Sequence, residues 1–484
     1  MTSTRGGSSR WVSTRSPSGR GASFVEALFR GLAPDGGLYV PRGLEPMDAG
    51  EALSRSRSFG DLAGRVARHL LGDEVPAAVV EATVEEALDF PLPLVDPSGS
   101  APASRDGRAG SPGAGATGAG VRILELFHGP SLAFKDFGAR FMAALMERVD
   151  PDPDPVRPRT VLVATSGDTG GAVAGAFHGR EGFRVVVLFP RDGVSGVQRR
   201  LFTTLGGNVT AVAVRGDFDD CQRMVKEAFR VHGAEGRYGE AGVGGPLRLT
   251  SANSINAGRL LPQSFYYAEA VRLLEEVRRG DTRRGAVFSV PSGNLGNLTA
   301  GMLARRLGFP VRGLVAATNA NDAFRRWLEA GDESPRPAVR TVSNAMDVAR
   351  PSNLERIRWL VSGDRGALKE EMTSYSFDDE ATLACMARVE EATGYLLDPH
   401  GAVAFLGAEA WRRDGRGDDP TEVVALATAH PAKFPDVVGR AVGRDPMVPA
   451  RLRRAMAGEE RSVEVEPTVE ALVEVLEDVR GGGG

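Results

Sequence analysis

The residue best suited to carbonyl chemistry in this sequence is Lys135. Lysine is rare here, with four lysines among 59 basic residues. Arginine keeps its proton in proteins, whereas a lysine amine can lose its proton and attack a carbonyl carbon. Lys135 follows a Gly129-Pro130 turn and stands between Phe134 and Phe137. Apolar neighbours disfavour the ammonium form, so this segment favours a lysine that forms a Schiff base.

A polar, glycine-rich loop follows the apolar run at 161–164. Its central residues are Ser166, Gly167, Asp168 and Thr169. Amides and hydroxyls at the start of a helix bind anions, so this loop could hold a substrate carboxylate. The same residues could serve only as the N-cap of an ordinary helix, and the motif alone does not separate the two interpretations.

A second glycine-rich loop follows the apolar run at 286–290 and precedes a helical pattern. It contains Gly293, Asn294, Leu295, Gly296 and Asn297. Successive N–H groups at a helix N-terminus form a cradle for phosphate. The Walker pattern is absent and no lysine stands nearby to reach a triphosphate, so a single phosphate fits better. A purely structural turn is the alternative.

Two further segments bring several polar side chains together. Thr428, His430 and Lys433 follow the apolar run at 423–427, and Lys433 is another of the rare lysines. The second segment precedes a helical pattern and contains Ser251, Asn253, Ser254, Asn256 and Arg259. We favour a ligand site over N-cap or surface chemistry for both segments.

Three other features have weaker support. The turn at 398–401, which contains His400, fits a functional site and a proline-fixed turn equally well. Lys226 and Lys369 lie in charged helical stretches and are predicted to be exposed surface residues.

The elements that must position these residues alternate along the chain. Apolar runs of strand length occur at 161–164, 185–189, 209–214, 287–290, 311–317 and 423–427. Helical patterns lie near 136–149, 170–179, 218–232, 257–279, 297–307 and 321–330. Continuous valine-rich strands separated by helices indicate parallel sheets covered on both faces. The polar loops should then gather at the carboxyl ends of the strands.

The two ends of the chain depart from this alternation. An opening α+β module is predicted over residues 1–96, with a strand at 11–14 and helices near 59–72 and 75–89. Residues 97–120 are nearly all Gly, Ala, Ser and Pro, which predicts a flexible insertion. A GxGxxG match at 113–118 lacks the flanking strand and helix that a dinucleotide site requires. A helix is predicted at 469–479, followed by four disordered glycines.

Composition argues against several classes of function. The 484 residues allow about two to four domains. A net charge of −4 argues against nucleic acid or an anionic membrane as a general partner. No apolar run approaches the roughly 18 residues of a transmembrane helix. Cys221 and Cys385 lie far apart, without metal-ligand spacing or a disulfide framework, which fits a reducing cytoplasm. The arginine-rich, acid-free first 25 residues also suit a transit peptide, but cytoplasm is the expected location.

Taken together, these segments resemble threonine synthase. That is a fold-type II pyridoxal-phosphate family related to threonine dehydratase and cysteine synthase. The resemblance runs in order from Val12 to about Val438. It rests on segments 13–15, 33–41, 127–137, 165–171, 251–263, 292–297, 398–400 and 428–434. The segments at 251–256 and 428–434 look like the bacterial and fungal branch of the family.

The resemblance implies a role for each site segment. Lys135 would carry pyridoxal phosphate, Gly293 to Asn297 would bind its phosphate, and Thr428 would face its pyridine nitrogen. The loop from Ser166 to Thr169 would hold the substrate carboxylate. The substrate phosphate would contact Ser251, Asn253, Ser254, Asn256 and Arg259, with Lys433 as a further candidate. The implied reaction converts O-phospho-L-homoserine and water to L-threonine and phosphate, without a metal.

The resemblance also implies the architecture. We expect a large cofactor-binding α/β domain at 121–135 and 236–440 and a small α/β domain at 136–235. The opening module would precede them, and a helical extension would occupy 441–484. The Pro17-Ser18-Gly19 segment and the 97–120 loop depart from the family pattern without touching the site motifs.

Two alternatives to this function stay open at this stage. A related lyase such as a threonine or serine dehydratase would use the same cofactor on a substrate without phosphate. A homologue without activity could act as a binding protein, although Lys135 and the three complete loops argue against it. The oligomeric state, monomer or homodimer, is open as well.

Overall fold

The computed structural model describes residues 10–19, 21–100, 120–230, 248–277, 285–414 and 421–481. Most of the expected insertion at 97–120, with its glycine motif, lies outside these residues, as do the last three glycines. Within the described residues, no helix is both long and apolar enough to cross a bilayer.

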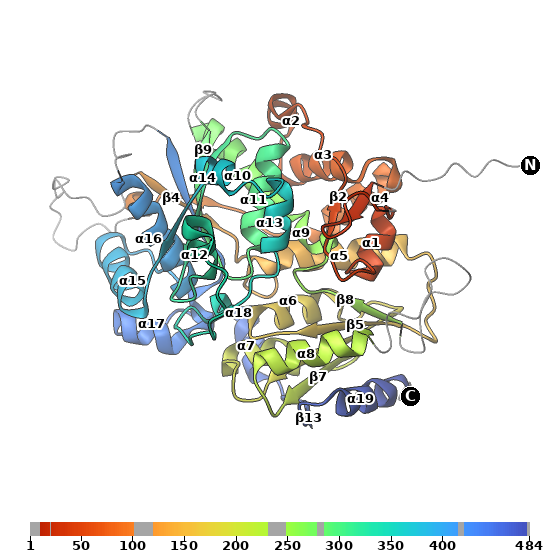
Figure 1. Cartoon of the computed structure of the whole chain (residues 1–484). Coiled ribbons are helices and arrows are strands. Elements are labelled where there is room, and N and C mark those ends of the chain that lie inside the picture. The colour runs from red at the N-terminus through yellow and green to blue at the C-terminus, as the bar shows by residue number, and fades with distance from the viewer. Residues whose placement is uncertain are drawn as a thin grey trace, which may run out of the picture.

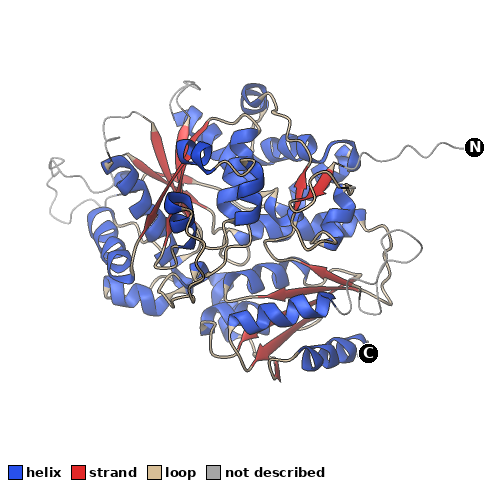
Figure 2. Ribbon diagram, in the orientation of Figure 1, coloured by secondary structure: helices blue, strands red, loops and turns tan. Residues whose placement is uncertain are grey.

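The larger of two parallel sheets has six strands, in the order β11-β10-β9-β12-β4-β3 (Figure 1, Figure 2). All neighbours are parallel except β3 and β4. The strands are β3 Leu94–Val95, β4 Val121–Glu125, β9 Ala286–Pro291, β10 Val311–Thr318, β11 Met372–Ser376 and β12 Glu422–Ala427. The central strand β9 is buried along its whole length, as expected for a parallel strand covered on both faces.

The smaller sheet has five parallel strands, in the order β13-β7-β6-β5-β8. The strands are β5 Arg159–Ala164, β6 Phe183–Pro190, β7 Val209–Val214, β8 Leu249–Ser251 and β13 Val463–Val465. These two parallel sheets, together with the opening module, confirm the predicted α/β fold.

Helices cover both faces of each sheet (Figure 2). Around the large sheet lie α10 Gln263–Val277, α11 Gly296–Arg306, α12 Ala323–Ala330, α13 Leu354–Leu360, α14 Arg365–Glu371, α15 Asp379–Thr393, α16 Pro399–Arg413 and α17 Pro435–Val442. Around the small sheet lie α5 Lys135–Val149, α6 Asp168–Phe177, α7 Gly196–Thr203, α8 Phe218–Ala228, α18 Ala450–Ala457 and α19 Val469–Gly481. Strand β9 shows the two-residue alternation: Phe288 packs with the α10 and α11 core, whereas Val287 packs with α16.

The opening module is tied together by its own contacts. Strand β1 (Trp11–Ser13) pairs antiparallel with β2 (Tyr39–Pro41), and α1 Phe24–Arg30, α2 Ala49–Arg55, α3 Phe59–Leu71 and α4 Ala77–Ala87 complete it. A capping box starts α1: Ser23 Oγ accepts a hydrogen bond from Glu26 N at 3.1 Å, and Glu26 Oε2 accepts one from Ser23 N at 2.7 Å. These elements confirm the predicted strand and helices of the module.

Two strands join a different sheet from the one that the sequence suggested. Residues 236–440 were expected in the large domain, but β8 at 249–251 pairs with β5 of the small sheet. Residues 441–484 were expected to form a helical extension, but β13 pairs with β7 and α19 packs on α8. Strand neighbours far apart in the chain are chosen by packing, which chain order does not encode.

Two helix boundaries also differ from the expectation. The predicted helix at 257–279 is divided into α9 (Ala257–Leu260) and α10, because Pro262 has no N–H to continue the hydrogen-bond ladder. Helix α16 begins at Pro399, inside the segment 398–401 that was expected to be a turn, since proline is well tolerated in the first turn and Asp398 caps it.

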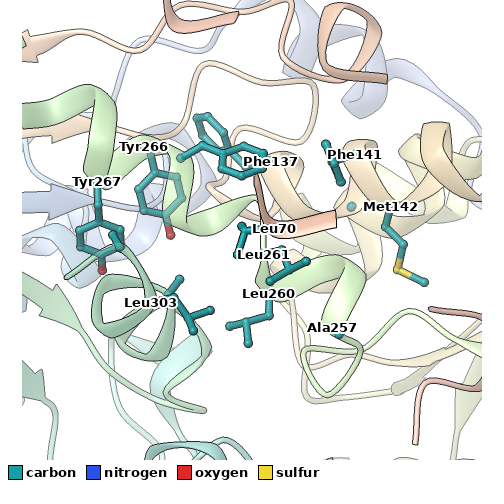
Figure 3. Close-up of a cluster of buried hydrophobic side chains, with 14 of the residues drawn as sticks. Leu70, Phe137, Phe141, Met142, Ala257, Leu260, Leu261, Tyr266, Tyr267 and Leu303 are labelled. Carbon is teal, nitrogen blue, oxygen red and sulfur yellow. The ribbon is translucent and has the colours of Figure 1, made fainter. Parts of the chain in front are cut away.

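A dense apolar core supports the start of α5, which carries Lys135. Phe137, Phe141 and Met142 of α5 pack with Leu260 and Tyr266, as Figure 3 shows. The rings of Phe137 and Tyr266 meet edge to face, with centroids 5.2 Å apart. This packing joins α5, α9, α10 and α11 beneath the polar loops and holds those loops in place.

Candidate active site

A cavity of about 740 Å³ lies between the two sheets, against the opening module. It is lined by the loops that follow β5, β8, β9 and β12, as expected for ligand sites of parallel sheets. The predicted residues on its wall are Lys135, Ser166, Gly167, Asp168, Thr169, Ser251, Asn253, Ser254, Arg259, Gly293, Asn294, Leu295, Gly296, Asn297 and Thr428. Asn256 and Lys433 are not on the wall.

Lys135 is the first residue of α5, and the segment before it is fixed to the loop after β12. Phe134 N donates to Thr428 O at 2.9 Å, and Ala133 forms an antiparallel bridge with Ala429. The amine Nζ lies 5.2 Å from the Phe134 ring centre. Lys135 and the Thr428 side chain are therefore held on one wall of the cavity by backbone contacts.

Burial changes the acidity of Lys135. It lowers the pKa of this amine to about 8, and the positive charges of Arg259 and Lys433 act in the same direction. The Asp168 carboxylate opposes the shift. The unprotonated fraction of this amine near neutral pH is therefore far larger than that of an ordinary lysine, as a nucleophile and proton acceptor requires.

The loop after β9 leaves the N-terminus of α11 open. Leu295 precedes the helix in the left-handed region, with φ of 61°, and makes no side-chain capping bond. The first N–H groups of α11 therefore have no side-chain cap and face an anion site. Gly293 has no room for a side chain, because an added Cβ would lie 2.8 Å from Met346 Cα.

The two asparagine side chains of this loop differ in their free donors. Asn294 Nδ2 donates to Ser254 Oγ at 2.6 Å, and Asn294 Oδ1 accepts from Ser352 N at 2.5 Å. Asn297 Oδ1 accepts hydrogen bonds from the Tyr266 and Tyr267 hydroxyls at 2.6 and 2.8 Å, while its Nδ2 has no partner among the described residues. This loop therefore offers backbone N–H groups and the Asn297 amide donor to a ligand.

The loop after β5 is braced by a threonine. Thr165 Oγ1 accepts from Gly167 N at 3.0 Å and from Gly170 N at 2.9 Å. The Asp168 carboxylate accepts from Gln198 Nε2 at 2.8 Å and pairs with Lys433. Burial alone would raise the pKa of Asp168, but the ammonium groups of Lys433 and Lys135 hold that pKa well below its ordinary value. A carboxylate ligand would therefore contact Ser166, Thr169 and backbone amides, since the Asp168 side chain is anionic.

The segment from Ser251 to Arg259 divides into structural and cavity-facing residues. Asn256 is fully buried: its Oδ1 caps α9 at Gly258 N, and its Nδ2 donates to Leu28 O and Ser251 O. The prediction that Asn256 binds substrate phosphate is therefore corrected, because both polar atoms already have partners. Hydrogen-bond partners of this kind are invisible in a sequence.

Arg259 is a buried cation on the cavity wall, as are Arg159 and Arg248. Its Nη1 donates to Ala252 O at 2.7 Å, while its Nε has no partner among the described residues. Burial lowers the pKa of this guanidinium to about 10, so it stays charged at neutral pH. Gly138 of α5 lets this segment approach, because a Cβ there would lie 2.6 Å from Arg259 O.

Lys433 does not face the cavity. Its side chain is fully buried, and its Nζ lies 2.5 Å from Asp168 Oδ1 and donates to Ser131 O at 3.0 Å. The prediction that Lys433 contacts a substrate phosphate is corrected for the same reason as Asn256: its donors are already engaged inside the protein.

Several wall residues were missed in the sequence. The loop from Ala345 to Ser352 lines the cavity, although no strand precedes it. His400 anchors this loop: its Nε2 accepts from Ala345 N at 3.2 Å while its Nδ1 contacts Asp398 Oδ2 at 2.7 Å. The polar composition of this loop was the only sequence signal that could have indicated a ligand site. The loop does not follow a strand, so that signal was weak. Lys226 is exposed as predicted, yet it also lines the mouth of the cavity.

Arg356 is another residue that the sequence did not indicate. Its guanidinium is buried and donates to Tyr39 O, Ser254 O and Ile255 O at 3.2, 3.2 and 2.5 Å. It thereby fixes the loop that contains Ser254 and Ile255 to β2 of the opening module. An arginine inside a helical stretch gives no sequence signal for such a role.

The families to which this chain is similar agree with the geometry of the cavity. The family model described as pyridoxal-phosphate dependent enzyme matches residues 111–429. The models for the N terminus and the C-terminal part of threonine synthase match residues 10–88 and 402–476. The threonine synthase of Serratia marcescens is 40% identical over 431 residues, which cover 89% of this chain and 90% of that protein. The chain belongs to the threonine synthase family.

Solved threonine synthase structures share the whole fold. The Escherichia coli enzyme superimposes with a TM-score of 0.83 at 37% identity, over 97% of this chain and 99% of that one. A threonine synthase from Brucella melitensis, solved with bound pyridoxal phosphate, gives a TM-score of 0.80 at 34% identity. It covers 97% of this chain and 98% of its own.

The cavity of this threonine synthase family member fits pyridoxal phosphate. The cofactor is an aldehyde with a phosphate and a pyridine ring, and each part has a counterpart on the wall. Lys135 offers an amine for the aldehyde, the uncapped N-terminus of α11 offers N–H groups for the phosphate, and Thr428 offers a hydroxyl for the pyridine ring. The family uses this cofactor, and the donor set of the chain is complete for it.

Proposed function

We propose that this chain converts O-phospho-L-homoserine and water to L-threonine and inorganic phosphate. The observation that supports it most is the convergence on one cavity of the Lys135 amine, two open helix N-termini and the buried Arg259. The substrate carries an amino group, a carboxylate and a phosphate, and this cavity offers a partner for each.

The two anionic groups of the substrate would be bound by different parts of the cavity wall. Helix α6 begins after a glycine N-cap, and Thr165 Oγ1 already accepts from Gly170 N, so the N–H groups of Asp168 and Thr169, together with Ser166, would bind the carboxylate. Arg259, with the side chains of Ser251, Asn253 and Ser254, would bind the phosphate. This arrangement orients the α carbon toward Lys135 and so lowers the entropic cost of reaction.

Lys135 would move the protons. Bound pyridoxal phosphate supplies an electron sink that stabilises negative charge at the α carbon. The Lys135 amine, unprotonated in part because its pKa is about 8, accepts the α proton and later returns a proton to the product. Loss of a β proton expels the phosphate from the γ carbon, the γ carbon gains a proton, and a water oxygen adds at the β carbon, so substrate and water balance threonine and phosphate.

The decisive assay separates this activity from a dehydratase. Purified enzyme with pyridoxal phosphate is incubated with O-phospho-L-homoserine, and phosphate and threonine are measured together. A parallel sample with threonine or serine is assayed for ketoacid. Equal amounts of phosphate and threonine support the proposal, whereas ketoacid alone supports the dehydratase.

A covalent test addresses the inactive-homologue alternative. Borohydride reduction followed by peptide mapping should find the cofactor attached to Lys135. A cofactor adduct elsewhere, or none, would overturn the whole assignment.

Arg259→Met tests the phosphate ligand. Removing a charged donor from a buried site should raise the KM for phosphohomoserine about 10- to 100-fold and weaken inhibition by inorganic phosphate in parallel. The control is Arg55→Met, because Arg55 is exposed and, in the described part of the chain, pairs only with Glu51. An unchanged KM in the Arg259 variant would place the phosphate elsewhere.

The proposal extends to the setting of the enzyme. Its partner is a small molecule, with neither nucleic acid nor membrane. We infer a cytoplasmic location, which the two free, buried cysteines Cys221 and Cys385 support.

A further inference from the structure

Lys433 and Asp168 form an ion pair behind the cavity wall. Both side chains are almost completely buried, and Nζ lies 2.5 Å from Oδ1. The pair joins the short helix Pro431–Lys433, which follows the large sheet, to the first residue of α6 beside the small sheet. Gln198 of α7 donates to the same carboxylate oxygen at 2.8 Å. Asp168 is therefore held from two sides.

Lys135 is subject to the field of the same carboxylate without being bonded to it. Asp168 acts on the Lys135 amine electrostatically and favours its protonated form. Lys135 Nζ nevertheless forms no hydrogen bond or ion pair with any residue in the described part of the chain. Two lysines thus lie near the Asp168 carboxylate, and of these two it is Lys433 that forms an ion pair with it.

We propose that Lys433 is a positioning residue: it occupies the Asp168 carboxylate and so leaves the Lys135 amine unpaired and able to lose its proton. The catalytic meaning of this inference rests on the proposed function, in which Lys135 is the proton acceptor. The electrostatic part concerns the amine itself and can be measured without turnover.

The physical reason is the cost of an isolated buried charge. Without Lys433, the Asp168 carboxylate would keep only an amide donor, and a buried carboxylate strongly attracts the nearest cation. That cation would be the ammonium form of Lys135. An opposite charge at close range raises an amine pKa by about 1–3 units, which would silence the amine at neutral pH.

Other charged groups around these three side chains complete the field. Arg259 of α9 acts on Lys135, and His400 of α16, which contacts Asp398, acts on Asp168. Asp136 of α5, whose pKa is raised to about 6 by burial, and His430 both lie in the field of Lys433. Asp136 Oδ2 is bonded to Ser131 N at 2.7 Å, which keeps it from replacing Asp168 as the partner of Lys433.

The test measures the Lys135 amine in the full-length protein stripped of cofactor. The rate of amine modification at Lys135 is followed against pH by peptide mapping. Lys433→Met should move the midpoint upward by about one pH unit or more. The double variant Lys433→Met with Asp168→Asn should return the midpoint to near the parent value, because the unpaired carboxylate is gone. Lys369→Met, at an exposed lysine, is the matched control and should not move it.

The holoenzyme gives a second readout: the acid limb of kcat against pH reports groups of the substrate complex, where the Lys135 amine is free, and it should shift upward in Lys433→Met and recover in the double variant. If Lys433→Met does not fold, Asp168→Asn alone should lower the midpoint. A folded Lys433→Met with an unshifted midpoint, or a double variant as shifted as the single one, would overturn the inference. These results are distinct from failure of the proposed function, which would appear as an absence of threonine formation by the parent enzyme.

Discussion

At the scale of single residues, Lys135 gains its reactivity from burial that is unfavourable for folding. An amine with an ordinary pKa of 10.5 is held at about 8, because its charged form is poorly solvated in the cavity. The Lys135 amine therefore binds its proton more tightly in the unfolded chain than in the folded chain. Active sites commonly carry instability of this kind in exchange for function.

Lys135→Met should therefore stabilise the cofactor-free protein by about 1–3 kcal/mol at neutral pH. The lysine penalty is constant below pH 8, shrinks as pH rises toward 10.5 and vanishes above it, so the gain should shrink in the same window. Urea unfolding at several pH values measures it. Lys369→Met, in an exposed position, should change stability by less than about 0.5 kcal/mol. A destabilised Lys135→Met protein would show that burial of this amine is not costly.

Lys135→Arg separates charge from chemistry. The variant keeps the positive charge but lacks an amine that can lose its proton, so threonine formation should be abolished. Circular dichroism would confirm that the variant is folded. Residual turnover above the background reaction would mean that another group carries the proton.

At the scale of elements, the loop between β9 and α11 is shaped by close backbone contacts rather than by side-chain ligands. Leu295 holds a left-handed φ of 61° that leaves the helix start open, and Gly293 presses against Met346. Backbone strain of this kind is found where the surrounding structure imposes it. The position of the N–H groups at the start of α11 therefore depends on the loop at 345–352 as much as on the sequence of their own loop.

Gly293→Ala tests this dependence. The added Cβ would lie 2.8 Å from Met346 Cα, so one of the two loops must move. Cofactor affinity should fall about tenfold or more, measured by fluorescence titration of the cofactor-free protein. Gly175→Ala is the matched control, because Gly175 is an exposed position of α6 and its added Cβ would meet nothing within 4 Å. That control should gain up to about 1 kcal/mol of stability, with cofactor affinity unchanged.

At the scale of the whole molecule, the last segment of the chain completes the small sheet. Strand β13 lies at its edge, and α19 buries Leu472 and Leu476 against α8 (Figure 1). The chain thus begins the large sheet at β3 and β4, builds the small sheet from β5 to β8, completes the large sheet with β9 to β12 and then returns to the small sheet at β13. Three chain connections therefore link the two halves on either side of the cavity.

Leu472→Ala should cost about 2–5 kcal/mol of stability, because its side chain is fully buried in this core. Equilibrium unfolding in urea measures the change. Val463→Ala, at a side chain that is 45% exposed, should cost less than about 1 kcal/mol. If Leu472→Ala left the main transition unchanged, the last segment would be an independent extension, as the sequence had suggested.

The sequence by itself determined the elements and the identity of the reactive groups. Valine-rich runs specify buried parallel strands, and the glycine-rich loops after β5 and β9 specify open helix starts, because both signals are local. The scarcity of lysine likewise indicated Lys135, because residue type can be read from the sequence without the fold. These local signals carried the fold class and the polar loops that form part of the cavity wall.

Only the tertiary structure decided which polar side chains are free to bind a ligand. Asn256 and Lys433 have the right chemistry, yet their donors are satisfied by Leu28 O, Ser251 O, Ser131 O and Asp168. The partners of β8 and β13 were decided in the same way. A hydrogen-bond donor can be recognised from one residue, whereas its occupancy depends on groups tens or hundreds of residues away that packing alone brings near.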